Sequence, residues 1–134
     1  MTDSSTTTLG TYLPEVESIY DGEYIHIALR LDLPDGVHIE PHEPDDPFMI
    51  PTVVTVHGLD EVAIGYPTPV EKHLGWNDLS LNVLQGRLTF VIIGRPRPNT
   101  TVTGGLTYQP CVGGACLPPR TTVWSVPDPA SVAA

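Results

Sequence analysis

Basic side chains are scarce in this sequence. Among its 134 residues, 6 are lysine or arginine and 16 are aspartate or glutamate, which gives a formal net charge of −10 at pH 7. A chain with this balance repels a phosphate backbone instead of releasing its counterions. We therefore expect neither nucleic acid nor an anionic membrane surface as a partner.

Long apolar runs are absent as well. No stretch reaches the 18 residues of a membrane span, and residues 1–10 (MTDSSTTTLG) lack the basic and apolar regions of a signal peptide. As written, the chain is expected to carry no export signal, and it is equally compatible with a domain cut from a longer protein. We predict a flexible segment over 1–10, one folded domain over 11–126 and a flexible tail over 127–134.

Helical patterning is the third absence. No window shows a sustained 3.6-residue apolar period, and fifteen prolines would interrupt nearly every helix. Residues 24–33 instead alternate apolar and polar side chains, which is typical of a half-buried strand. Further strands are predicted over residues 52–57, 61–64, 78–84, 87–93, 100–108 and 121–126. Seven to nine short strands of this kind favour an all-β fold, an immunoglobulin-like antiparallel β-sandwich.

Two sites carry turn signals. Pro34-Asp35-Gly36 predicts a turn, because proline presets φ at the first central position and glycine tolerates a positive φ. Gln85-Gly86 is interpreted as a tight hairpin between two of the predicted strands.

The common catalytic motifs are missing too. No Gly-x-Ser-x-Gly elbow, P-loop or Gly-x-Gly-x-x-Gly occurs, so hydrolase, NTPase and dinucleotide-binding functions lack support. His38, Glu40 and His42 would share one face of an extended chain, a spacing that offers ligands to a divalent metal. We favour a solvated acidic loop broken by prolines, and we expect no metal and no cofactor.

What the sequence does have is a close pair of cysteines. Cys111 and Cys116 enclose Val-Gly-Gly-Ala and lie between strand-like flanks. We predict that they occupy opposite strands, or the connecting turn, of one hairpin, with Cα atoms close enough to bridge. A closed loop of about six residues yields only roughly 2 kcal/mol of stabilisation in the chain-entropy model. Spacing alone thus favours cycling between dithiol and disulfide, and leaves a structural disulfide, metal ligation or idle thiols as alternatives.

The flanks of the pair carry a resemblance. Residues 106–119 (LTYQPCVGGACLPP) resemble the YQ-x-C...C-x-P-P signature of the N-terminal domain of the thiol:disulfide interchange protein DsbD. Residues 33–39 (LPDGVHI) are similar to the family's Asp-Gly-aromatic strand, and residues 65–67 (GYP) lie where the family has its cap loop. The resemblance covers roughly residues 24–126.

The resemblance implies an immunoglobulin-like domain that exchanges electrons with a thioredoxin-like protein or domain, in an extracytoplasmic location when the chain is part of a longer protein. It implies that Cys116 forms the mixed disulfides and that Cys111 resolves them. Residues implied to cap the cysteines or to contact the substrate are Tyr66, Pro67, His38, Glu40 and Tyr108, with residues 68–70 continuing the cap loop. His38 and Glu40 stand where family members usually have aromatic residues facing the cysteines.

Local charge gives separate support for Cys116 as the reactive thiol. The net charge of −10 disfavours any thiolate, so the stabilising groups must be local. We expect these to be the amides of Gly113 and Gly114 and the guanidinium of Arg120. Arg120 is four residues from Cys116 and nine from Cys111.

The alternative function is a non-catalytic β-sandwich interaction module of a larger redox protein. In that case the disulfide is structural and only stabilises the hairpin.

Overall fold

The regular structure of the described residues is entirely β. A computed structural model describes residues 10–73 and 80–126, and within these ranges twelve strands and no helix occur. The predicted all-β class is therefore confirmed. None of the described residues forms a helix long and apolar enough to cross a membrane.

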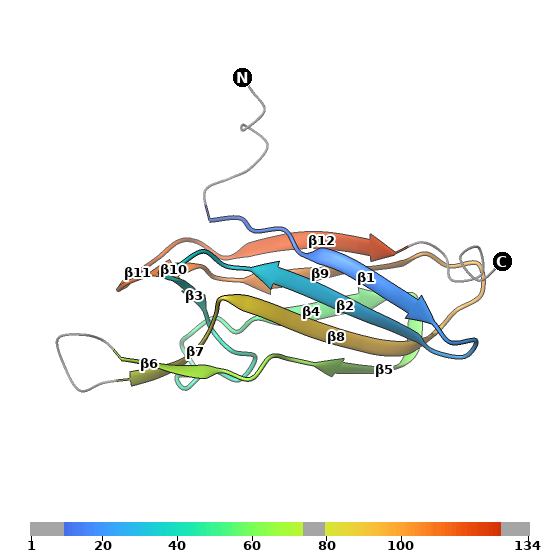
Figure 1. Ribbon diagram of the computed structural model, residues 1–134, viewed down its shortest axis with the longest axis horizontal. Coiled ribbons are helices and arrows are strands. Elements are labelled where there is room, and N and C mark those ends of the chain that lie inside the picture. The colour runs from blue at the N-terminus through green and yellow to red at the C-terminus, as the bar shows by residue number, and fades with distance from the viewer. Residues whose placement is uncertain (1–9, 74–79, 127–134) are drawn as a thin grey trace, which may run out of the picture.

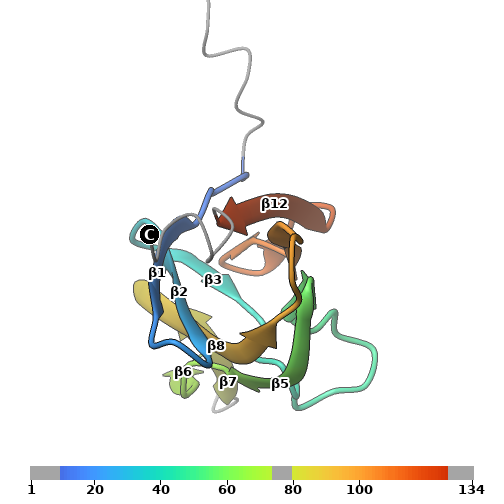
Figure 2. The ribbon, with the colours of Figure 1, turned by 90° about the vertical axis from the view of Figure 1, so that its right-hand side faces the viewer.

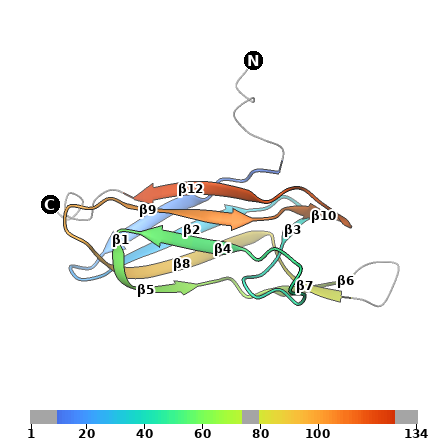
Figure 3. The ribbon, with the colours of Figure 1, turned by 180° about the vertical axis from the view of Figure 1, so that it is seen from behind.

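Two antiparallel sheets face each other along the length of the molecule (Figure 1). One has four strands, in the spatial order β1 (Glu15–Tyr20), β2 (Ile25–Asp32), β8 (Arg87–Pro96) and β5 (Leu59–Gly65). The other has three strands, in the order β12 (Arg120–Val126), β9 (Val102–Tyr108) and β4 (Val53–His57), which lie side by side in Figure 3. Seen along the long axis, the four-stranded sheet curls around beneath β12, so the pair encloses one core (Figure 2).

The alternation of β2 builds this core, as predicted. Ile25, Ile27, Leu29 and Leu31 are buried, whereas His26, Arg30 and Asp32 are exposed. The neighbouring strand β8 adds Leu88, Phe90 and Ile92 in register with them. Each such side chain, removed from water, contributes about 1.5–3 kcal/mol.

A glycine on β9 admits the indole of Trp124. Trp124 of β12 is paired with Gly104 and donates a hydrogen bond from Nε1 to the carbonyl oxygen of Gly105 (3.2 Å). A Cβ atom at Gly104 would lie 2.7 Å from Cε2 of the indole, closer than van der Waals contact allows. The sandwich can therefore close around Trp124 only because position 104 has no side chain.

At one end of the sandwich the chain continues into a third sheet. This sheet has five strands, in the order β11 (Ala115–Cys116), β10 (Cys111–Val112), β3 (Val37–Ile39), β7 (Ser80–Gln85) and β6 (Val70–His73). It forms the left-hand end of the molecule in Figure 1. The paired strands β2 and β8 pass into the paired strands β3 and β7, so two long strands bend together from one sheet into the next.

The bend corrects one prediction and confirms another. Gln85-Gly86 is not a hairpin, because β7 pairs with β3 and β6 while β8 pairs with β2 and β5. Gly86, with φ of 74°, is a corner whose carbonyl accepts a hydrogen bond from the Leu33 amide (2.9 Å). The predicted turn at Pro34 is present, since the Val37 amide donates to the Pro34 carbonyl oxygen (3.1 Å) and Gly36 has φ of 87°.

Some strands and boundaries differ from the sequence-based predictions. The ranges predicted for β2, β4, β5, β7, β8, β9 and β12 overlap the observed strands, while β1 and β6 had no predicted counterpart. Val70, expected in a loop, is the first residue of β6. Gly10, assigned to the flexible segment, is buried, while residues 1–9, 78–79 and 127–134 of the predicted segments lie outside the described residues.

Candidate functional site

The two cysteines form a disulfide across a short hairpin. Cys111 on β10 and Cys116 on β11 are direct cross-strand partners, and their Cα atoms are 4.0 Å apart. The predicted hairpin placement is confirmed. Val112 pairs with Ala115, so Gly113 and Gly114 alone form the turn.

The turn depends on one of these glycines. Gly113 has φ of 60°, the left-handed region in which a side chain is strained, whereas Gly114 has no positive φ. A Cβ atom added at either glycine would meet nothing within 4 Å. The tip of the hairpin is therefore open to solvent, and a partner can approach it without displacing another part of the described chain.

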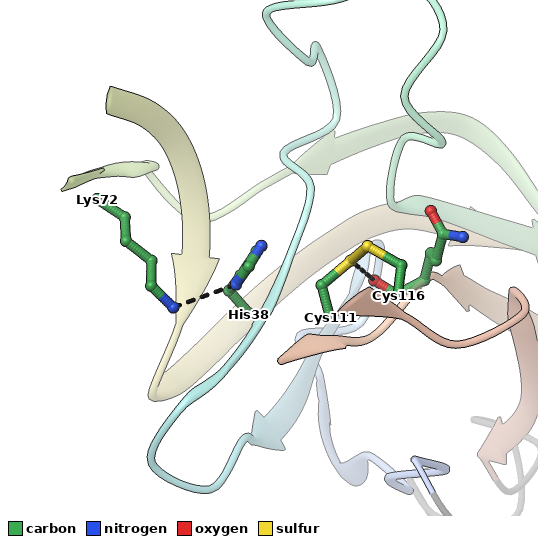
Figure 4. Close-up of a disulfide and its surroundings, with 5 residues drawn as sticks. His38, Lys72, Cys111 and Cys116 are labelled. Carbon is green, nitrogen blue, oxygen red and sulfur yellow. Dashed lines mark hydrogen bonds between the residues drawn. A yellow bond between two sulfur atoms is a disulfide. The ribbon is translucent and has the colours of Figure 1, made fainter. Parts of the chain in front are cut away.

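The two sulfurs differ sharply in environment. Cys111 is 2 % exposed, whereas Cys116 is exposed on the edge strand of its sheet. Sγ of Cys111 also lies 3.9 Å from the carbonyl oxygen of Gln109, which is an acceptor for the thiol when the disulfide is reduced (Figure 4). An incoming thiolate thus has access to Cys116 and none to Cys111.

His38 stands directly beside the buried cysteine. It is the cross-strand partner of Cys111 on β3, and cross-strand partners project from the same face of a sheet. His38 is itself only 4 % exposed. The sequence-based expectation that residue 38 faces the cysteines agrees with this register. The expectation of a solvated loop at His38 and Glu40 is wrong, because both residues are buried.

Lys72 reaches His38 from two strands away. Both β3 and β6 flank β7, and Nζ of Lys72 lies 3.2 Å from Nδ1 of His38. Figure 4 shows the imidazole between Lys72 and the disulfide. A lysine ammonium has donors and no acceptor, so Nδ1 must accept this hydrogen bond and Nε2 must carry the ring proton. Burial, and secondarily the charge of Lys72, lowers the pKa of His38, which keeps the imidazole neutral.

Glu40 is a second buried titratable group near the same face. The residue is 5 % exposed, and its Oε1 has no hydrogen-bond partner among the described residues. Burial, and secondarily the charge of Asp45, raises the pKa of Glu40. Asp45 in turn accepts hydrogen bonds from the amide and Nδ2 of Asn82 (3.0 and 3.1 Å), which ties the segment after Glu40 to β7.

The described residues contain no group of three or more His, Cys, Asp or Glu side chains that could hold a metal ion.

The base of the hairpin is held by the first described residues of the chain. The hydroxyl of Tyr108 donates to the carbonyl oxygen of Tyr12 (2.8 Å) and accepts from the Tyr12 amide (2.6 Å). Tyr108 is fully buried, so it supports the hairpin from the core and offers no surface to a substrate. Arg120, paired with Tyr108, donates to Thr11 Oγ1 (3.2 Å) and to the Pro118 carbonyl oxygen (2.8 Å). Its expected influence on Cys116 stays a prediction.

Tyr66 lies where β5 ends and packs on the segment that follows β3. Its ring stacks on His42 (centroids 3.9 Å apart) and meets Phe90 edge-on, and its hydroxyl accepts from the Val54 amide (2.9 Å). Pro67 lines a shallow hollow of about 220 Å³ together with Tyr66, His42 and nearby prolines. That hollow is not lined by either cysteine. The cap expected at Tyr66 and Pro67 stays a prediction.

Sequence reasoning missed Lys72. The signal available for it is compositional, because Lys72 is the only lysine in the 134 residues. Its partner His38 is 34 residues away, and no local pattern links the two positions. The structure places the only ammonium side chain of the sequence next to the histidine that faces Cys111.

Comparison with known proteins identifies the fold. No protein-family model and no curated protein sequence matches the chain. Among solved structures, the N-terminal periplasmic domain of ScsB from Proteus mirabilis superposes with a TM-score of 0.68 at 13% identity, over 92% of this chain. The chain spans about half of that ScsB structure, 49% of its length.

Two structures from Neisseria meningitidis also match. The DsbD N-terminal domain in the reduced form gives a TM-score of 0.57 at 16% identity and covers 93% of both chains. The DsbD N-terminal domain in complex with the PilB N-terminal domain gives 0.57 at 18% identity, over 85% of this chain and 80% of that one. The chain therefore has the immunoglobulin-like fold of the DsbD and ScsB N-terminal domains.

Proposed function

We propose that this domain is a thiol–disulfide exchange module that passes electrons through a reversible Cys111–Cys116 disulfide. The observation that carries the proposal is the asymmetry of the pair. An exposed cysteine on the edge strand of a solvent-open hairpin is bonded to a cysteine that is 2 % exposed. A disulfide with one accessible sulfur has a defined point of attack, and its buried sulfur is protected from competing thiols.

From this domain the exchange reaction requires only the sulfurs of Cys111 and Cys116. A partner thiolate attacks Sγ of Cys116, a new intermolecular S–S bond forms, and the electron pair of the broken bond goes to Sγ of Cys111. A second partner thiolate then attacks the partner's own sulfur in the mixed disulfide. This releases the domain as a dithiol and leaves the partner oxidised. The reverse sequence reduces a partner disulfide, with Cys116 as the attacking thiolate and Cys111 as the resolving thiolate.

We further propose a thioredoxin-like protein or domain as the partner and an extracytoplasmic location. Supporting the first point, a DsbD N-terminal domain of the same fold has been solved in complex with the PilB N-terminal domain. Supporting the second, the ScsB structure is a periplasmic domain. Tyr66 and Pro67 are proposed to limit access to the disulfide from the side of β5.

The reduction potential tests the exchange function. The oxidised domain is equilibrated in glutathione buffers of graded potential, and the dithiol fraction is counted from the mass added by an alkylating agent. An exchanging pair is expected to titrate above about −300 mV, the region of catalytic and labile disulfides. A pair that stays oxidised well below that potential is a structural pin, and the domain is then a non-catalytic interaction module.

A further inference from the structure

The mechanism proposed above uses the sulfurs alone and leaves His38 and Lys72 without a role. The strand register places both on the face of the five-stranded sheet that also bears Cys111. Val83, on the same face of β7, is fully buried although it lies outside the main core cluster. This face is therefore a second, small interior next to the disulfide.

Breaking the disulfide delivers a negative charge into that interior. When a thiolate attacks Cys116, the electron pair goes to Sγ of Cys111, and this residue is 2 % exposed. Burial disfavours a thiolate, and the carbonyl oxygen of Gln109 at 3.9 Å favours the protonated thiol. The chain as a whole adds further repulsion with its net charge of −10. A local donor and a local positive charge are needed to offset these effects.

We propose that Lys72 and His38 form a positioning pair that stabilises the Cys111 thiolate and so directs exchange to Cys116. This inference rests on the proposed function. Lys72 holds Nδ1 of the neutral imidazole at 3.2 Å, which leaves the Nε2 proton as the donor available on the strand that pairs with Cys111. Because a better-stabilised leaving thiolate departs faster, attack at Cys116 is favoured over attack at Cys111.

The surrounding charges are consistent with this assignment. The titratable groups around His38 are Lys72 from β6, Cys111 from β10 and the carboxyl of Glu40 directly after β3. Burial raises the pKa of Glu40, so this carboxyl opposes a nearby thiolate less than an ordinary carboxylate would. Lys72 is thus the positively charged group at this face among the described residues.

The test measures the thiolate pKa of Cys111 in the intact chain with Cys116→Ser, from the pH dependence of thiolate ultraviolet absorbance. Lys72→Gln removes the charge, and Lys72→Arg restores it. Arg87→Gln is the matched control, since it removes one positive charge from a side chain that is 92% exposed and pairs only weakly with Asp32 (3.6 Å). Lys72 lies on the edge strand β6, and Lys72→Arg keeps a hydrogen-bond donor at this position.

Lys72→Gln is expected to raise the Cys111 pKa by about one unit, which is a tenfold loss of thiolate at any pH below it. Lys72→Arg is expected to retain most of the effect and Arg87→Gln to show none. Equal pKa values in Lys72→Gln and Arg87→Gln would overturn the pairing while leaving exchange by the wild type intact. An inert wild-type disulfide accompanied by a shifted Lys72→Gln pKa would instead overturn the proposed function alone.

Discussion

Cys111 and Cys116 stand directly opposite each other on β10 and β11, yet Cys111 is 2 % exposed and Cys116 is open to solvent. The difference follows from their places in the five-stranded sheet. β10 has a neighbour on both sides, β3 and β11, whereas β11 is an edge strand. The fold therefore makes two neighbouring cysteines chemically distinct before any partner binds.

The hairpin turn is predicted to tolerate a side chain at one glycine and not at the other. Gly113→Ala places a Cβ atom at φ of 60°, which costs about 1–2 kcal/mol, while Gly114 has no positive φ and open space around it. Urea unfolding of the oxidised protein is expected to show this decrease in the free energy of unfolding for Gly113→Ala. For Gly114→Ala the decrease is expected to be less than half as large. Equal losses would mean that the turn does not have the described conformation.

Glu40 is predicted to lower the free energy of unfolding of the domain as the pH rises from 4.5 toward neutrality. Its folded pKa is raised above the ordinary 4.5 by burial, so its protonated form stabilises the fold below pH 4.5, and that contribution is lost as the pH rises through the folded pKa. Glu40→Gln cannot ionise, so its stability relative to the wild type should increase between pH 4.5 and neutrality.

Denaturant unfolding at a series of pH values measures this difference. The exposed Glu43, in the same segment, supplies the control Glu43→Gln, which removes the same charge without relieving burial. A wild-type to Glu40→Gln difference that does not change with pH, or that Glu43→Gln reproduces, would contradict the assignment.

The predictability of the fold varies from strand to strand for a physical reason. β2 has one face in the core and one in water, so its alternation is visible in the sequence. β1 is an edge strand with no fully buried residue, and β6 is a four-residue edge strand that includes Glu71 and Lys72, so neither carries a strong apolar pattern. The corner at Gly86 has the residues typical of a hairpin turn. Only the pairing of β7 with β3 and β6 shows that it is a corner between two sheets and not a hairpin.

The candidate site was predictable to the extent that it is local. Cys111, Cys116 and the turn between them lie within six residues, so spacing and glycine content were enough to place both cysteines in one hairpin within bridging distance. The register of His38 with Cys111, the contact of Lys72 with His38 and the burial of Glu40 join segments far apart in the chain. The proposed roles of Tyr66 and Pro67 depend on a loop whose contacts with His42 and Phe90 have no sequence signature.

Trapping of mixed disulfides by the two single-cysteine variants tests the central claim most directly. Cys111→Ser leaves the exposed Cys116 and is expected to accumulate a mixed disulfide with an oxidised thioredoxin-like protein, seen as a shifted band on a non-reducing gel. Cys116→Ser leaves the buried Cys111 and is expected to trap at least tenfold less under the same conditions, because the thiol of a residue that is 2 % exposed cannot reach a partner's disulfide. Equal trapping by both variants, or more trapping by Cys116→Ser, would contradict the account.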